Sequence, residues 1–286
     1  MKNDEMITLA KFLAISGIIL PMLPHKNLIP DINLTPYSIW LATVVVSGIS
    51  YLSYLLKRYV FHESGTLVSG IIGGLYSSTA TISVLARKSR KASEQEATDY
   101  VAAMLLAVSM MFLRFMILIL IFSREIFLSI YPYLLTMAVV AAIVAWFIHS
   151  RQKRPEGQSA ETEEDDSSNP LEFKVALIFA ILFVIFTFLT HYTLVYAGTG
   201  GLYLLSFVSG FSDITPFILN LLQNTGSVAA LIITACSMQA IISNIMVNMF
   251  YALFFAGKGS KLRPWILGGF GVVIVCNLVL LLFFYI

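Results

Sequence analysis

Residues 70–87 read GIIGGLYSSTATISVLAR, a run of span length that contains three glycines and a tract of small hydroxyl side chains. A helix that only anchors a protein in lipid is built from apolar side chains. In hydrocarbon, non-helical backbone is tolerated only where it is buried in protein or lines a cavity. The stretch therefore predicts a membrane helix that opens near Gly73 and Gly74, just before Ser77. Close helix packing through Gly70 and Gly74 is the alternative interpretation.

The composition indicates an all-α integral membrane protein. The chain has 286 residues, 58% of them hydrophobic and 12% charged, and its mean hydropathy is +0.85. A soluble domain of this size cannot bury so much apolar surface. Apolar runs of about 20 residues recur along the chain, so the lipid bilayer is the expected partner. The net charge of +2 does not indicate nucleic acid, and no basic patch lies between aromatic residues. About nine transmembrane helices are predicted, at 6–23, 36–59, 65–86, 97–122, 132–148, 171–196, 200–222, 226–256 and 264–286.

The chain divides into four predicted segments. Residues 1–35 form an N-terminal span and loop, 36–149 a first repeat of four spans, 150–170 a linker, and 171–286 a second repeat of four spans. The linker is basic and then acidic with almost no apolar residues, which is typical of a disordered segment.

The internal repeat is indicated by glycines and polar residues that align at a single offset. Sliding the chain by about 136 residues brings Gly74 onto Gly210 and Ser77 onto Asp213. An even number of spans in each copy gives both copies the same orientation, so two parallel four-helix repeats with discontinuous polar spans are predicted. In transporters, binding sites lie where such repeats face each other.

A second polar stretch, residues 209–223 (SGFSDITPFILNLLQ), repeats the first with an acid at its centre. Gly210 and Pro216 favour a break, because proline lacks an amide donor and clashes with the preceding turn. A carboxylate inside a span is costly and marks a functional site by default. Asp213 is therefore predicted to ligate a metal cation or to carry a proton; the alternative is a structural pairing with Arg114.

Polar residues of the fourth and eighth spans complete the predicted site. Arg114 pairs with Asp213, neutralises an anionic substrate, or snorkels from the span end. The polar side chains of the eighth span either line a pathway or bond across helices as structural glue. The predicted substrate- and ion-binding residues are Gly74, Ser77, Ser78, Thr79, Thr81, Arg114, Ser209, Asp213, Thr215, Ser237, Asn244 and Asn248.

These features predict a secondary transporter. Opened turns free carbonyl oxygens for a cation, and half-helix N-termini offer amides to an anion. The sequence has no P-loop, GxSxG or HExxH motif, so it does not indicate an ATPase, a hydrolase or another enzyme. A small inorganic ion is the expected substrate, with a cation favoured. An anion or phosphate-type carrier and a non-transporting membrane regulator are the alternatives, and a bound metal cation is the one cofactor considered.

Three stretches resemble one known family. Residues 70–90 (GIIGGLYSSTATISVLARKSR) resemble the GGLxSSTAxTxSLARRSR motif of the family called domain of unknown function 4010. SGFSDITPFILNL resembles its SGLxDVDAITLSL motif, and SNIMVNMFYALFFAGK resembles SNTLVKAGLALLLG. Two positions depart from the family pattern, because Thr215 replaces a second acid and Asn248 replaces a lysine. The motif residues carried over are Ser77, Ser78, Thr79, Asp213 and Asn244.

The resemblance implies an integral membrane protein that takes part in the homeostasis of magnesium or another ion. Family members are often fused behind an MgtC/SapB-type domain that is missing here. The resemblance therefore also implies a separate MgtC-type protein as a partner, and a homo-oligomer is the alternative.

Charge in the loops predicts the orientation. The basic loop 87–96 and the basic start of 150–170 flank the fourth and fifth spans and are predicted to be cytoplasmic. In a bacterial inner membrane, nine spans then place the N-terminus outside and the C-terminus in the cytoplasm. The basic residues at 57–58 and 258–263 would face outward in this arrangement.

Overall fold

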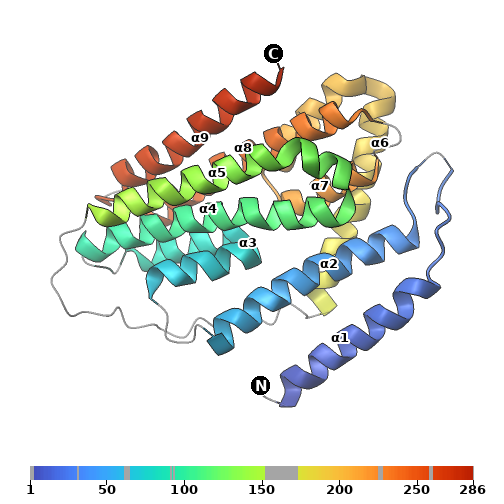
Figure 1. Ribbon diagram of the computed structural model, residues 1–286, viewed down its shortest axis with the longest axis horizontal. Helices are drawn as coiled ribbons and strands as arrows, with labels where there is room; N and C mark the ends of the chain where they lie inside the picture. The colour runs from blue at the N-terminus through green and yellow to red at the C-terminus, as the bar shows by residue number, and fades with distance from the viewer. Residues whose placement is uncertain are drawn as a thin grey trace.

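The computed structural model describes residues 3–30, 32–60, 65–90, 92, 94–151, 173–224, 228–257 and 260–285. Apart from Ser150 and Arg151, the predicted disordered linker lies outside these residues. The elongated helical bundle is shown in Figure 1. Its helices are α1 (Asn3–Met22), α2 (Pro36–Leu55) with the π-helix η1 (Leu56–Val60), α3 (Thr66–Lys88), α4 (Glu94–Phe122), α5 (Arg124–Ser150), α6 (Phe173–Ser209), α7 (Ile214–Gln223), α8 (Ala230–Ala256) and α9 (Arg263–Tyr285).

Seven helices of the described chain are long and apolar enough to cross a membrane, which makes this a multi-pass membrane protein. They are α2 continued by η1, α3, α4, α5, α6, α8 and α9. The sequence predicted nine. The predicted seventh span, 200–222, is not one helix, because it includes the end of α6 and the ten-residue α7.

The start of α5 differs from the prediction. The fifth span was expected to begin at Pro132, but α5 begins at Arg124 and contains the proline. Ser123 stabilises the earlier start, because its side chain accepts the amide of Ile126 as an N-cap. The segment predicted as a connection is therefore the first two turns of the helix.

Contacts between the two halves of the chain fix the directions of the helices. Near one end of α9, Gly269 packs against Ile148 at the end of α5. Further along α9, Asn277 accepts a hydrogen bond of 2.5 Å from Tyr133, near the start of α5. The helices α5 and α9 are therefore antiparallel.

The same relation holds for the other two pairs of long helices. Asn33, just before α2, lines a cavity with His191 of α6, whereas Ser50, late in α2, lines another with Phe179, early in α6. Arg90, just before α4, donates to the carbonyl of Phe254 at the end of α8. Thus α2 is antiparallel to α6, and α4 is antiparallel to α8.

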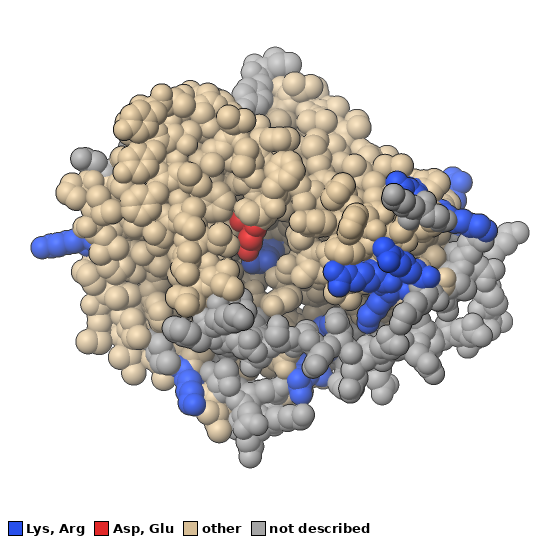
Figure 2. All heavy atoms as spheres, turned by 180° about the vertical axis from the view of Figure 1, so that it is seen from behind, with Lys and Arg blue, Asp and Glu red and all other residues tan. Residues whose placement is uncertain are grey.

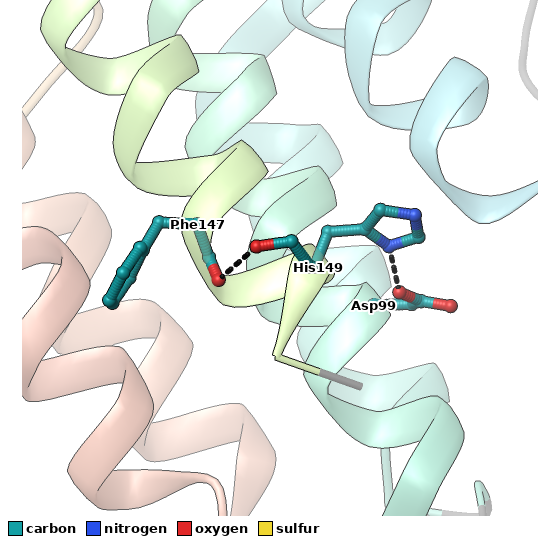
Figure 3. Close-up of polar contacts among 4 residues, drawn as sticks. Asp99, Phe147 and His149 are labelled. Atoms are coloured by element: carbon teal, nitrogen blue, oxygen red, sulfur yellow. Dashed lines mark hydrogen bonds and ion pairs between the residues drawn. The ribbon is translucent and has the colours of Figure 1, made fainter. Parts of the chain in front are cut away.

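The C-terminal ends of α2, α5 and α8 and the start of α4 lie at one end of the bundle, which we name the basic end. We name the opposite end the far end. A side-chain contact ties two helices there. Nδ1 of His149 on α5 lies 2.5 Å from Oδ1 of Asp99 on α4, as Figure 3 shows. The contact is partly exposed, so it contributes little to stability.

The helix α3 consists of two arms joined at Ser77. Ser77 has φ −159° and ψ 108°, an extended conformation that ends one helix and precedes the next. A Cβ atom on Gly73 would meet the side chain of Thr81, although residues eight apart in a straight helix lie about 12 Å apart along its axis. The second arm, 78–88, therefore folds back along the first, 66–76. We name the pair hairpin 1.

Both ends of hairpin 1 lie at the basic end. Gly70 packs on the backbone of Ala103 near the start of α4, and Gly74 packs one turn further along that helix. The first arm thus runs in the direction of α4. The second arm brings the chain back to Lys88, a short loop away from Glu94 where α4 begins.

A second re-entrant element enters from the far end. The helix α6 breaks at Gly198, whose φ of 59° and ψ of −153° are readily adopted by glycine. An arm, 199–209, then leads to a non-helical tip, 210–213, and α7 follows. Asn224, directly after α7, lines a cavity together with Gly198, so the chain has returned to the end from which it entered. We name the arm, the tip and α7 hairpin 2.

The two halves are inverted, and this corrects the predicted parallel orientation. In the first half α2, α4 and α5 traverse the bundle, and in the second half α6, α8 and α9 do so. Each hairpin enters and leaves at the same end. The prediction counted both polar stretches as full spans, which gave each half an even number of crossings. Because each half has three crossings, the second half begins at the end of the bundle opposite to the one where the first half begins.

Candidate functional site

The tips of the two hairpins meet at one cavity of about 410 Å³. Three pairs of corresponding elements line it: α2 and α6, the two hairpin tips, and α4 and α8. Figure 2, which views the molecule from behind, shows an acidic and a basic side chain close together in a hollow surrounded by uncharged residues. The cavity lining includes one residue of each sign, Asp213 and Arg114.

The tip of hairpin 1 contributes the hydroxyl tract that the sequence singled out. Ser77, Ser78 and Thr79 all line the cavity. The backbone opens at Ser77 and not at Gly73 or Gly74, where the break was predicted. The Ser77 hydroxyl lies 3.4 Å from the amide of Ala80, longer than an ordinary N–H···O hydrogen bond. The N-terminus of the second arm is therefore only weakly capped.

The tip of hairpin 2 contributes the acid. Asp213 is the N-cap of α7, and its Oδ1 accepts the amide of Thr215 at 2.9 Å. A carboxylate at this position neutralises the partial positive charge of a helix N-terminus. The side chain of Asp213 is exposed, and both Asp213 and Thr215 line the cavity.

Glycines bring each hairpin close to its neighbouring helix. A Cβ on Gly74 would overlap the backbone of Ala107 on α4, and a Cβ on Gly210 would overlap Ser243 on α8. The packing interpretation of the glycines is therefore correct for Gly70 and Gly74. Each member of the second pair lies 136 residues after its counterpart in the first.

Side chains of α4 and α8 hold the carbonyls at the ends of the entering arms. Arg114 donates from Nη1 to the carbonyl of Tyr76 at 2.8 Å. Asn244 donates from Nδ2 to the carbonyl of Gly210 at 3.2 Å, and Ser243 donates to the preceding turn. These bonds satisfy acceptors that a helix end leaves free.

Arg114 lies inside the protein and does not snorkel. It is 8% exposed, and its Nε atom is buried with no hydrogen-bond partner among the described residues. Its interaction with Asp213 is electrostatic attraction across the cavity, while its hydrogen bond goes to hairpin 1. The interpretation of the two residues as a structural pair is therefore weakened, since each is bonded to its own half.

The structure brings most of the predicted site residues together at this cavity. Those that line it are Gly74, Ser77, Ser78, Thr79, Arg114, Asp213, Thr215 and Asn244. Four others are not in its lining. Thr81 packs on Gly73 inside hairpin 1, and Asn248 donates to Asn244. Ser209 and Ser237 are buried and donate to carbonyls of their own helices.

Sequence reasoning missed the walls of the cavity. Ser47 and Ser50 of α2 line it together with Phe179 of α6. The signal was the spacing of the two serines, which three residues apart share one face of a helix. Both serines are buried, which is where small polar side chains of a membrane helix normally lie.

A metal centre built from protein ligands is not apparent in the part of the chain that the structure describes. No three His, Cys, Asp or Glu side chains gather there, and Asp213 is the one carboxylate among the residues lining the cavity. Divalent cations are usually held by several carboxylate and carbonyl oxygens. Among the described residues that line the cavity, Asp213 is therefore the one acidic side chain that could ligate a metal cation.

Comparison with known proteins places this arrangement in a family. The model of the family described as domain of unknown function DUF4010 matches residues 44–256, which include both hairpins. The chain belongs to this family. An uncharacterized protein of Aquifex aeolicus (strain VF5) is 25% identical over 227 residues, which cover 77% of this chain and 96% of that protein. No solved structure matches the chain.

Proposed function

We propose that the protein is a secondary transporter that binds a small ionic solute between the tips of two inverted hairpins. One observation carries the proposal, namely the cavity where hairpins entering from opposite ends meet. Transporters with inverted repeats bind their substrates at the repeat interface, on discontinuous helices. Exposing this site alternately to the two sides requires only that one half moves against the other.

The contacts support an internal duplication as the origin of the two halves. Gly74 packs on Ala107 of α4 and Gly210 packs on Ser243 of α8, so each hairpin reaches the next long helix through a glycine, and the two contacts are 136 residues apart. A non-transporting regulator would be favoured by a dry, closely packed interface between the two motifs. The cavity of about 410 Å³ between them favours transport instead.

Within this proposal Asp213 is the residue for a cation, either a transported ion or a coupling proton or sodium ion. Its carboxylate faces the cavity and is held at the start of α7 by the Thr215 amide. The protein chemistry needed is binding and release, so no enzymatic step is assigned. The bacterial inner membrane remains the proposed location.

Reconstitution in liposomes tests transport. Purified protein should carry at least one of Na⁺, K⁺, Mg²⁺, H⁺, phosphate or a small carboxylate faster than protein-free liposomes. Asp213→Asn should lower that flux at least about tenfold, which corresponds to about 1.4 kcal/mol of lost interaction. Asp99→Asn is the matched control, because this acid lies at the basic end outside the cavity.

Two results would contradict the proposal. Flux of none of these solutes above the liposome background rejects transport, and unchanged flux in Asp213→Asn rejects the assignment of that residue.

The inverted halves also reverse the proposed orientation. Basic residues lie on the loops and helix ends of the basic end, and Figure 2 shows many of them gathered there, on its right. By the positive-inside rule this end is cytoplasmic. The described ones are Lys57, Arg58, Arg87, Lys88, Arg90, Arg151, Lys261 and Arg263. The nine-span prediction placed the basic residues at 57–58 and 258–263 outside. In the proposed orientation the described ones among them lie on the cytoplasmic side together with the other basic residues of the basic end.

In this orientation α1 begins in the cytoplasm and α9 ends outside. Figure 1 shows α1 and α2 running in opposite directions, with the N-terminus toward the basic end. Single cysteines at Lys26 and Arg151, in a background with Cys236 and Cys276 replaced, check this in cells. A membrane-impermeant thiol reagent should label position 26 in intact cells and position 151 only after permeabilisation. The reverse pattern would restore the original orientation.

A further inference from the structure

We infer that hairpin 1 binds an oxyanion group, a carboxylate or a phosphate, of the solute. The inference rests on the proposed function and names the chemistry of one side of the same cavity. It adds to the cation expected at Asp213 a separate position for negative charge, formed by Ser77, Ser78, Thr79 and Arg114.

In hairpin 2 the helix that starts at the cavity is capped by a carboxylate of the protein itself. There α7 starts at the cavity, and the chain itself supplies a carboxylate, because Asp213 accepts the amide of Thr215 at 2.9 Å. The N-terminus of a helix carries about half a positive charge and unpaired amides, which an anion satisfies. In hairpin 2 this requirement is met within the protein.

Hairpin 1 has the same backbone feature without the anion. Its second arm, 78–88, also starts at the cavity and is long enough to have a full N-terminal turn. The corresponding side chain is Ser77, which is neutral and lies 3.4 Å from the amide of Ala80. The first-turn residues Ser78 and Thr79 line the cavity, so a ligand there has amides and hydroxyls as donors.

Arg114 is the independent observation that points to a ligand. It is more than nine-tenths buried, lines the cavity, and has a buried Nε without a hydrogen-bond partner in the described part of the chain. A buried guanidinium is costly unless it is paired. One donor, Nη1, is held by the Tyr76 carbonyl. A carboxylate or phosphate beside hairpin 1 would compensate the charge of this guanidinium, and Arg is the side chain best suited to these groups.

The size and walls of the cavity fit a solute larger than a bare ion. Its volume of about 410 Å³ is lined in part by Phe115, Phe179 and Tyr251. Apolar walls with a few placed polar groups are typical of small-molecule sites. The oxyanion would lie at hairpin 1 and the remainder of the solute against these rings.

Binding to the purified full-length protein in detergent tests the inference. The probes are sodium salts of inorganic phosphate, acetate, succinate and glycine, with sodium chloride at matched ionic strength as the reference. At least one probe should raise the midpoint of thermal unfolding above the reference and show saturable binding by calorimetry. Phosphate alone would identify a phosphate site, and acetate, succinate or glycine would identify a carboxylate site.

Ser77→Asp is the decisive variant. It gives hairpin 1 the built-in carboxylate that hairpin 2 already has, so it should fold and should bind the probe at least about tenfold more weakly. Arg114→Gln should weaken binding by a similar factor through loss of the guanidinium, and Arg114→Lys should do so less. Ser129→Asp and Arg90→Gln are matched controls at exposed positions away from the cavity and should bind as the wild type does.

Specific outcomes overturn the inference. It is rejected if no oxyanion binds the wild-type protein, or if folded Ser77→Asp and Arg114→Gln both bind with unchanged affinity. Should Ser77→Asp not fold, Arg114→Gln and Arg114→Lys decide. Flux of a cation without any oxyanion binding rejects this inference and keeps transport. Oxyanion binding without any flux rejects transport and keeps this inference.

Discussion

Hairpin 1 and hairpin 2 share their backbone design but differ in charge. Each breaks at the cavity, packs through a glycine on the next long helix, and has a carbonyl of its entering arm held by a side chain of that helix. At the tips, however, hairpin 1 has Ser77 where hairpin 2 has Asp213. The side chains that hold them also differ, since Arg114 is charged and Asn244 is neutral. The scaffold is thus nearly symmetric, and the charges on it are not.

This difference separates what builds the site from what selects the solute. Glycines and helix breaks occur in both halves because both hairpins must reach the cavity. Among the residues that line the cavity, the acid and the base occur once each, in different halves. An ion pair serving only structure needs no cavity, whereas here each charge is bonded to its own hairpin and both line a common space.

The largest expected effect tests the glycine contacts. In Gly74→Ala the new Cβ would overlap backbone atoms of Ala107, which cannot move aside. In Gly210→Ala it would overlap the Oγ and Cβ of Ser243 and the amide nitrogen of Asn244, and of these atoms only the hydroxyl can rotate away. We expect Gly74→Ala to lower the free energy of unfolding by about 3 kcal/mol and Gly210→Ala by about 2 kcal/mol. Chemical unfolding in detergent measures both.

Gly268→Ala is the control for the glycine substitutions. Gly268 lies in α9 with nothing within 4 Å of an added Cβ, so alanine should leave stability equal or raise it slightly. Equal losses for Gly74→Ala and Gly210→Ala would show that the two hairpins pack on their helices with the same tolerance.

A smaller effect is expected when the N-cap side chains at the two hairpin tips, Asp213 and Ser77, are removed. Asp213→Ala removes a charged cap with a 2.9 Å bond and should cost about 1–2 kcal/mol of unfolding free energy. Ser77→Ala removes a weak neutral cap and should cost about 0.5 kcal/mol. Hydrogen–deuterium exchange should rise in the first turn of α7 for Asp213→Ala and change little in hairpin 1 for Ser77→Ala.

Ser123→Ala serves as the reference for this pair of variants. It removes the cap of α5 outside the cavity, so it should lower stability without changing exchange at either hairpin. A greater loss for Ser77→Ala than for Asp213→Ala would reverse the comparison between the hairpins.

Much of the fold follows from the sequence, because apolar run length and composition mark membrane helices. The membrane class, α2, α4, α8 and α9 were predicted with similar bounds. The direction of the chain after each break was not, since α3 with 23 residues has the length of a full span. Hydropathy is the same for a helix that continues and one that folds back. The signal was in the charges at 57–58 and 258–263, which the nine-span orientation placed on the side opposite to the other basic loops.

The candidate site was predicted in part for a similar reason. Ser77 and Asp213 were recognised because small hydroxyls and an acid are unusual inside a span. Ser237 and Asn248 share that polarity but are buried outside the cavity lining and donate hydrogen bonds within α8, and sequence spacing alone does not tell which polar side chains of a helix reach a cavity. Ser47 and Ser50 were missed because two serines in an apolar run resemble ordinary packing positions.

The position of the cavity has an electrical consequence. It lies part-way along α2 and α4, between the basic end and the far end. Moving one elementary charge across the whole membrane at 100 mV changes its free energy by about 2.3 kcal/mol. Moving it only to the middle therefore changes its free energy by about 1 kcal/mol. A solute bound by Arg114 together with a cation at Asp213 would carry both signs to that depth. Binding of the pair would then be nearly independent of voltage, whereas binding of either partner alone would follow it.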